Sequence, residues 1–314
     1  MVLSKSQLFL FLTVTSVILS LAVTMPTPVL SQVNETASTP QINFWQGAFL
    51  GFVQGATEFL PISSTAHLKV VPVIMGWGDP GITFTAVIQL GSIVAVVSYF
   101  WVFLLEVITG ARKALSCSDY QDNNLRIVIG IIIGNLPIVF FGLLVKYFFS
   151  QFYNSNLRSM AVIATTSIFM SLLMGLAEKI GEQKRNLCEL SINDGILVGL
   201  AQALALIPGS SRSGLTLTGG LLIGLTRETA ARFSFLLGIP AITLAGLVEL
   251  KDLLTTGIGN MGITTVLAGV ISSAIFSYLA IDWLLRFLQT TSIWVFVWYR
   301  LVFGLVLLGM IGMQ

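Results

Sequence analysis

Two stretches of the sequence share one form: GFVQGATEFLPISST at residues 51–65 and GLAQALALIPGSSRS at residues 199–213. In each, an apolar run meets a proline that is followed by serines. Such a turn interrupts a helix, because proline lacks an amide hydrogen and serine side chains compete for backbone hydrogen bonds. We therefore expect a broken helix within residues 44–76 and another within residues 193–225.

Each half of a broken helix has roughly fifteen residues, which is short of the ~20 that cross a bilayer. Two such halves predict a re-entrant hairpin that enters and leaves on the same side of the membrane. Six other apolar segments are long enough to span. They are residues 82–106, 125–148, 158–177, 233–250, 262–286 and 293–312. The sequence thus predicts an all-α polytopic membrane protein with six transmembrane helices and two re-entrant helical hairpins.

Composition agrees with a membrane location. Of 314 residues, 55% are hydrophobic and only 10% are charged, with a mean hydropathy of +0.91. Soluble domains carry about 25% charged residues. The net charge of +2 is too small to suggest nucleic acid as a partner. Cys117 and Cys188 lie in separate polar loops and have the spacing of neither a disulfide framework nor a zinc site.

The first residues differ from the rest of the chain. Residues 1–32 contain one early lysine and an apolar run, which predicts a signal peptide or an N-terminal membrane anchor. Residues 33–43 predict a flexible linker, and residues 44–314 an integral-membrane domain.

The two broken segments belong to an internal repeat, because the spans that follow them are also alike. FTAVIQLGSI begins at Phe84 and FSFLLGIPAI begins at Phe233. We place the first repeat at about 44–177 and the second at about 193–312. An odd number of spans separates the two hairpins, so they should enter from opposite faces and bring their serine-rich turns together near the midplane of the bilayer.

Charge supports this topology when the first hairpin starts outside. Nine basic residues then flank inner loops and three flank outer loops, as the positive-inside rule requires. The inner residues are Arg112, Lys113, Arg126, Lys179, Lys184, Arg185, Arg227, Arg232 and Arg286, and the outer ones are Lys146, Arg158 and Lys251. Both cysteines fall on the inner side.

The two turns gather the polar residues of the membrane domain. The first holds Gln54, Glu58, Ser63, Ser64, Thr65 and His67, and the second holds Gly209, Ser210, Ser211, Arg212 and Ser213. Glycine, hydroxyls and a helix N-terminus suit the second turn to an oxyanion, and Arg212 adds a planar fork for phosphate oxygens. The first turn offers a nucleophile in Ser64, a titratable ring in His67 and a carboxylate able to hold a cation or a proton. Together these groups suit phosphoryl transfer.

Other interpretations stay open at this point. Each serine could be a helix cap, and Glu58 and Arg212 could form a structural ion pair between the hairpins. Arg300, deep in the last span, is expected to pair with a buried carbonyl or carboxylate. The architecture favours a transporter or flippase for a prenyl-phosphate lipid or small anion, whereas the residue set favours an intramembrane enzyme acting on a phosphorylated lipid.

Two longer segments resemble the signature segments of a known family. QGATEFLPISSTAH at residues 54–67 and PGSSRSGLTLTGGLLIGLTRETAARFSFLLGIPA at residues 208–241 are similar to those of the undecaprenyl-diphosphate phosphatase family, also known for bacitracin resistance. The likeness runs from about residue 44 to the C-terminus. It implies hydrolysis of a long-chain prenyl diphosphate at the outer face of the bacterial plasma membrane, which recycles the lipid carrier of peptidoglycan synthesis. A need for Mg²⁺ or Ca²⁺ is also implied.

The resemblance assigns roles to four residues. Glu58 would hold the cation or assist proton transfer, Ser64 would be the nucleophile or position a water, His67 would be an acid or base, and Arg212 would clamp the diphosphate. The metal site would also use Gln54. The substrate-binding residues would be Gln54, Ser63, Thr65, Gly209, Ser210, Ser211 and Ser213.

This chain departs from the family pattern in three ways. Gln54 stands where the family has Glu or Gln, so one carboxylate is available for a metal. Ala66 stands where a glycine often precedes the histidine, and the first forty residues are expected to have no counterpart in typical members. A homodimer is left open.

Overall fold

The computed structural model describes residues 42–149, 153, 157–256 and 262–313. The segment predicted at residues 1–32, and most of the predicted linker at 33–43, lie outside the described residues. Asn43 at the end of that linker caps the first described helix, because its side chain accepts from the Gln46 amide while the Gln46 side chain accepts from the Asn43 amide.

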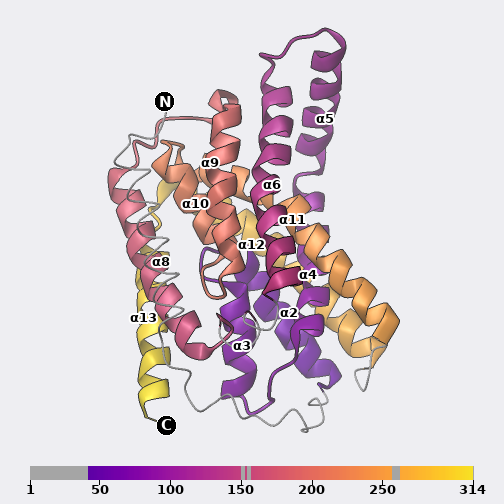
Figure 1. Cartoon of the computed structure of the whole chain (residues 1–314), viewed down its shortest axis with the longest axis vertical. Helices are drawn as coiled ribbons and strands as arrows, with labels where there is room; N and C mark the ends of the chain where they lie inside the picture. The colour runs from indigo at the N-terminus through magenta and orange to yellow at the C-terminus, as the bar shows by residue number, and fades with distance from the viewer. Residues whose placement is uncertain (1–41, 150–152, 154–156, 257–261, 314) are drawn as a thin grey trace.

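The described residues form helices joined mostly by short turns (Figure 1). The helices are α2 (Phe44–Glu58), α3 (Ser64–Ile74), α4 (Ile82–Tyr99), α5 (Trp101–Ser116), α6 (Asn123–Phe148), α8 (Met160–Ile180), α9 (Ile192–Ala203), α10 (Arg212–Leu222), α11 (Arg227–Thr256), α12 (Ile263–Thr290) and α13 (Trp294–Gly312), with 3₁₀ turns η3 (Leu187–Glu189) and η4 (Leu204–Leu206).

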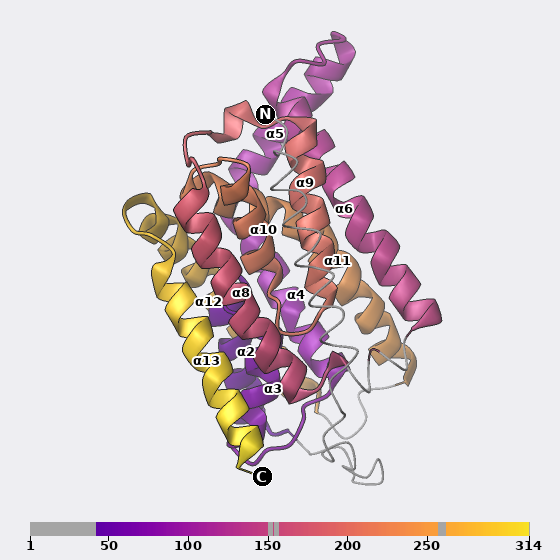
Figure 2. The same cartoon turned by 60° about the vertical axis from the view of Figure 1, so that its left-hand side comes forward.

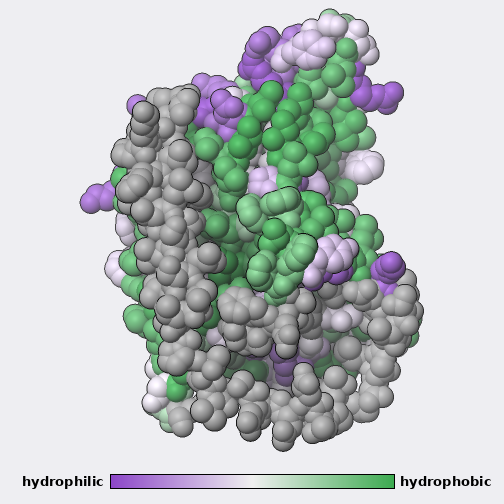
Figure 3. All heavy atoms as spheres, in the orientation of Figure 1, coloured by the Kyte–Doolittle hydropathy of each residue, from purple (hydrophilic) through white to green (hydrophobic). Residues whose placement is uncertain are grey.

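Five described helices are long and apolar enough to cross a membrane: α6, α8, α11 over Arg227–Val248, α12 and α13. The pair α4 and α5 makes a sixth when it is taken as one span. Figure 3 shows apolar side chains along most of the visible length of α5 and α6, with hydrophilic ones at their joined end. The predicted fold class, an all-α polytopic membrane protein, is confirmed.

The segment predicted as one span at residues 82–106 is divided between two helices. Helix α4 ends at Tyr99, and the axis of α5 is bent from that of α4 by 69°. Phe100 at the bend is buried and packs its ring near those of Phe103 and Phe235. Residues 97–103 contain neither proline nor glycine, so the sequence carries no signal for the bend and its hydropathy continues through it.

The two broken helices are present where the sequence predicts them. One break separates α2 from α3, and the other separates α9 and η4 from α10. The residues that precede α3 and α10, Ser63 and Ser211, have positive φ angles of 75° and 71°. This conformation is uncommon for residues other than glycine, so its presence at equivalent positions shows that the two turns share one backbone form.

The two broken pairs occupy opposite ends of the molecule. In Figures 1 and 2, α2 and α3 lie in the lower part and α9 and α10 in the upper part. Inverted repeats predict this arrangement. Entry of the pairs from opposite faces of a membrane stays a prediction.

Each hairpin packs on a helix of the other repeat. Helix α2 lies along α12, and α9 lies along α6. A Cβ added to Gly51 would overlap the carbonyl oxygen of Gly269, and one added to Gly199 would overlap that of Gly134. Glycines at equivalent positions therefore bring both pairs of helix backbones into direct contact, as small residues do in membrane proteins.

Ion pairs fix the loop that joins the repeats. Arg185 contacts Asp194 at 2.6 Å and also donates to the carbonyl of Ile223. The hydrogen bond with Asp194 raises the pKa of Arg185 further above its usual value. Arg227 contacts Glu178 at the same distance of 2.6 Å. The start of α9 and the end of α10 are thus held together at one end of the molecule.

Candidate active site

The turns of the two hairpins meet, as the sequence predicts. Ser213 of the second turn donates to the Leu60 carbonyl of the first at 2.9 Å. Arg300 on α13 is fully buried and donates to the carbonyls of Pro61 at 3.2 Å and Gly209 at 2.7 Å. The prediction that Arg300 pairs with a buried carbonyl is confirmed, and this one side chain links both turns.

Glu58, the last residue of α2, is the acceptor at the centre of this junction. Its Oε2 accepts from Gln54 Nε2 at 3.0 Å and from Ser64 Oγ at 2.6 Å. Its Oε1 accepts from Gln89 Nε2 at 3.3 Å and from Arg212 Nη2 at 3.4 Å. Four donors match the acceptor capacity of an ionised carboxylate. Gln54 and Glu58 are four residues apart, so they lie on one face of α2 and their side chains meet.

The contact between Ser64 and Glu58 is the shortest of the four. At 2.6 Å it has the length of a hydroxyl that donates to a charged oxygen. Ser64 is the first residue of α3 and only partly buried, so the break in the helix presents its hydroxyl to the carboxylate. A hydroxyl held against a base in this way is the arrangement of an activated nucleophile.

Arg212 begins α10 and reaches Glu58 across the junction. Its Nη1 also donates to the Ser234 carbonyl at 3.1 Å, and its guanidinium carbon lies 5.9 Å from the centre of the Phe59 ring. Its Nε is buried and has no hydrogen-bond partner among the described residues. A Cβ on Gly238 would overlap Nη1, so that glycine makes the space for the guanidinium.

Gln89 is a site residue that sequence reasoning missed. The only signal for it is the likeness of FTAVIQLGSI and FSFLLGIPAI, which places Gln89 at the position of Gly238. In the first repeat this position carries an amide that reaches Glu58, and in the second a glycine gives room to Arg212. Equivalent positions of the two repeats therefore contribute different chemical groups to one site.

Three serines behind Gln54 were also missed. The Ser92 hydroxyl on α4 accepts a hydrogen bond from Gln54 Nε2 at 3.4 Å. It also lies 3.1 Å from the hydroxyl of Ser273 and 2.8 Å from that of Ser277, both on α12. All three are fully buried. Isolated serines in apolar helices give no sequence signal, and here they orient Gln54 toward Glu58.

His67 lies on α3 and faces α13. Its Nδ1 is 2.7 Å from the Ser63 carbonyl oxygen, and its Nε2 is 2.5 Å from the Tyr299 hydroxyl. Its ring is nearly parallel to that of Phe303, at 4.7 Å between centroids. Ser64 donates to Glu58, so within the described residues Glu58 is placed to take the Ser64 proton and His67 is not.

The remaining predicted residues shape the turns. Ser210 donates to the Ile207 carbonyl at 2.6 Å, and Ser211 caps α10 by accepting from the Gly214 amide at 3.1 Å. Capping, one of the alternatives raised by the sequence, is therefore what the Ser211 hydroxyl does in this structure. Gly209 supports the second turn with a φ of 87°.

Two residues of the first turn are placed differently. Thr65 is exposed on the first turn of α3, and the Ser63 hydroxyl is buried with no partner among the described residues. Substrate binding by these two residues and by the serines of the second turn stays a prediction.

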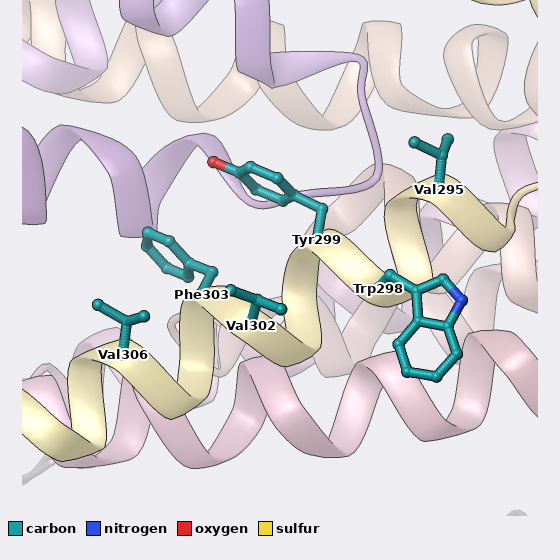
Figure 4. A pocket seen from close by; sticks show the side chains of 6 residues that line it. All are labelled: Val295, Trp298, Tyr299, Val302, Phe303 and Val306. Carbon is teal, nitrogen blue, oxygen red and sulfur yellow. The ribbon is translucent and has the colours of Figure 1, made fainter.

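A groove runs beside the histidine. It has a volume of about 480 Å³ and is lined by residues of α13. Figure 4 shows them: Val295, Trp298, Tyr299, Val302, Phe303 and Val306. The hydroxyl of Tyr299 points away from α13, toward the helix that carries His67.

Comparison with known proteins assigns the chain to a family. The family described as Bacitracin resistance protein BacA matches residues 47–306. This chain belongs to the BacA family. A Nostoc relative is 58% identical over 310 residues, covering 98% of this chain and 97% of its own. A relative from Trichormus variabilis is 58% identical over 314 residues (99% and 98%), and one from Trichodesmium erythraeum is 59% identical over 280 residues (89% and 90%). Each relative carries the name undecaprenyl-diphosphatase.

The comparisons also bear on the expectation that typical members lack the first forty residues. The BacA family match begins at residue 47, but the Nostoc and Trichormus relatives align over 98% and 99% of the chain. The first forty residues therefore have a counterpart in these two relatives, whereas the Trichodesmium relative aligns over 89% of the chain.

A divalent cation can be tested against the donors of this BacA family site. The described residues contain no group of three or more His, Cys, Asp or Glu side chains that could hold a metal. Glu58 supplies one carboxylate, and Gln54 and Gln89 supply amide oxygens once their side chains rotate. Mg²⁺ is commonly bound by one or two carboxylates together with substrate phosphates and water. The donor set fits a cation shared with a phosphate, and a cage made by the protein alone is not available in the described site.

Proposed function

We propose that this protein is an undecaprenyl-diphosphatase that converts undecaprenyl diphosphate into undecaprenyl phosphate and inorganic phosphate. The observation that carries the proposal is the Ser64 hydroxyl 2.6 Å from Glu58, beside an arginine on the same carboxylate. The names and near full-length identity of the BacA-family relatives support it.

The geometry supports a division of labour. Glu58 takes the proton of the attacking oxygen, which belongs to Ser64 or to a water that Ser64 positions. The attack forms a new bond to the terminal phosphorus and breaks its bond to the bridging oxygen, which leaves with the lipid monophosphate. When the attacking oxygen is that of Ser64, a water then hydrolyses the phosphoserine, which releases inorganic phosphate and restores the hydroxyl. Arg212 holds oxygens of the transferred phosphoryl group, and its Nε, which has no partner among the described residues, is available to donate to them.

His67 and the turn residues complete the proposal. His67 exchanges a proton during the reaction, as acid or base. The Ser63 hydroxyl, which has no partner among the described residues, is available to the substrate. Thr65, Gly209, Ser210, Ser211 and Ser213 line or shape the phosphate-binding turns. Glu58 and Gln54 would hold a divalent cation, Mg²⁺ or Ca²⁺, which would supply positive charge to the phosphate oxygens.

The proposed location is the bacterial plasma membrane, with the site open to the outer face. The distribution of basic residues in the loops supports this orientation. There the reaction would recycle the lipid carrier of peptidoglycan synthesis and confer resistance to bacitracin.

Phosphate release by the purified protein tests the function. With undecaprenyl diphosphate and Mg²⁺ in detergent, the wild type should release inorganic phosphate, and EDTA should stop the release. Glu58→Gln should lower the rate by about a hundredfold or more, because the base is lost. Glu106→Gln, at an exposed carboxylate on α5, is the matched control and should keep the wild-type rate. If phosphate is not released but sealed vesicles take up a prenyl phosphate or an anion, the protein is a transporter.

A further inference from the structure

The last span contains a tyrosine that the proposed chemistry does not use. Tyr299 on α13 contacts His67 across 232 residues of sequence, at 2.5 Å between the hydroxyl and Nε2. The two rings are nearly parallel, with 5.7 Å between their centroids. The next residue, Arg300, links the two turns. One turn of α13 therefore contacts both the junction and the histidine.

The hydrogen bonds of His67 define its tautomer. A carbonyl oxygen only accepts, so Nδ1, which is 2.7 Å from the Ser63 carbonyl, must carry a hydrogen. In the neutral ring Nε2 then holds the lone pair, and it accepts from the Tyr299 hydroxyl. Nε2 is consequently the only ring nitrogen that can accept a proton, and Tyr299 decides where it points.

The surroundings leave the ring little freedom to turn. Phe303 stacks on it at 4.7 Å, and His67 itself is only 7% exposed. Tyr299 is 42% exposed and lines the groove beside α13. Tyr299 thus lines the open groove and places its hydroxyl against the buried imidazole.

We propose that Tyr299 is a positioning residue for His67. Its hydroxyl donates to Nε2, keeps the neutral ring in the Nδ1–H tautomer and holds the basic nitrogen in the orientation that proton exchange during hydrolysis requires. The proposal rests on the proposed phosphatase function for its kinetic consequence, but its structural part stands on the contacts alone.

The chain has a single histidine, which permits a direct test without activity. ¹⁵N-histidine labelling gives one imidazole, whose two nitrogen shifts in detergent report the tautomer and the hydrogen bond at Nε2. The wild type should show the Nδ1–H form, and Tyr299→Phe, which keeps the ring, should move the Nε2 signal. Tyr278→Phe, at another half-exposed tyrosine that packs on Tyr99, should leave both signals unchanged. An Nε2–H tautomer in the wild type overturns the proposal whether or not any variant folds.

Kinetics then separate positioning from packing. Tyr299→Phe should lower kcat about tenfold, as expected for the loss of one hydrogen bond that orients a reacting group, and leave KM unchanged. Tyr278→Phe should match the wild type. Unchanged nitrogen signals together with an unchanged kcat in Tyr299→Phe overturn the proposal. A wild type that shows the tyrosine-dependent signals but releases no phosphate would instead refute the phosphatase function.

Discussion

Replacement of Arg212 separates catalysis from structural pairing. If Arg212 existed to neutralise Glu58, its removal would strand a buried charge, which costs about 3–5 kcal/mol. The structure predicts a smaller loss of stability. Glu58 keeps three other donors, Gln54, Ser64 and Gln89, and the contact with Arg212 is the longest of the four at 3.4 Å.

We therefore expect Arg212→Ala to reduce the free energy of unfolding by only about 1–3 kcal/mol, the contribution of its bonds to Glu58 and to the Ser234 carbonyl. Phosphate release should fall about a hundredfold or more, because a preorganised contact to the phosphoryl group is lost. Arg212→Lys should lose a similar amount of activity, since lysine offers a point charge without the planar fork.

The assays are denaturant unfolding in mixed micelles and phosphate release from undecaprenyl diphosphate. Arg232→Lys is the matched control, because Arg232 pairs with Glu228 on the surface of α11 and should tolerate the change in both assays. The decisive variant is the double mutant Glu58→Gln/Arg212→Ala. Recovery of stability and activity in it would show that the two residues form a structural pair, and would refute the catalytic assignment of both.

Three further outcomes are expected. Arg300→Lys should unfold more easily by about 1.5–3 kcal/mol in the same denaturant assay, because an ammonium reaches one of the two carbonyls that the guanidinium links; unchanged stability would contradict this role. Gly238→Ala should displace the guanidinium beside it and slow phosphate release, whereas Gly309→Ala, where nothing lies within 4 Å of the new Cβ, should keep the wild-type rate. The exposed Cys117 and Cys188 should react with an impermeant maleimide only after spheroplasts are lysed, and labelling of intact spheroplasts would reverse the proposed topology.

The sequence was sufficient for features that depend on local backbone chemistry. Pro61, Pro208 and the serines beside them interrupt helices wherever the chain goes, so both breaks could be predicted. Glu58 and Arg212 could be assigned to the site because ionisable residues are costly inside a membrane.

Contacts between residues far apart in the chain could not be predicted from the sequence. The bend at Phe100 has no proline or glycine beside it, and its neighbour Phe235 lies on another helix. Gln89 cannot be told from an ordinary interhelical amide until Glu58 is placed beside it. The partner of His67 lies 232 residues away, and no local pattern connects them.

The packing of α2 against α12 has a consequence for the order in which the protein is synthesised and folds. The face of α2 that carries Gly47, Gly51 and Gly55 is synthesised early. The helix that covers this face, α12, begins at Ile263, late in the chain. The first hairpin therefore cannot complete its packing until α12 has been synthesised. Two polypeptides divided in the loop at residues 181–191 should each be inactive alone and regain activity when they are produced in the same cell.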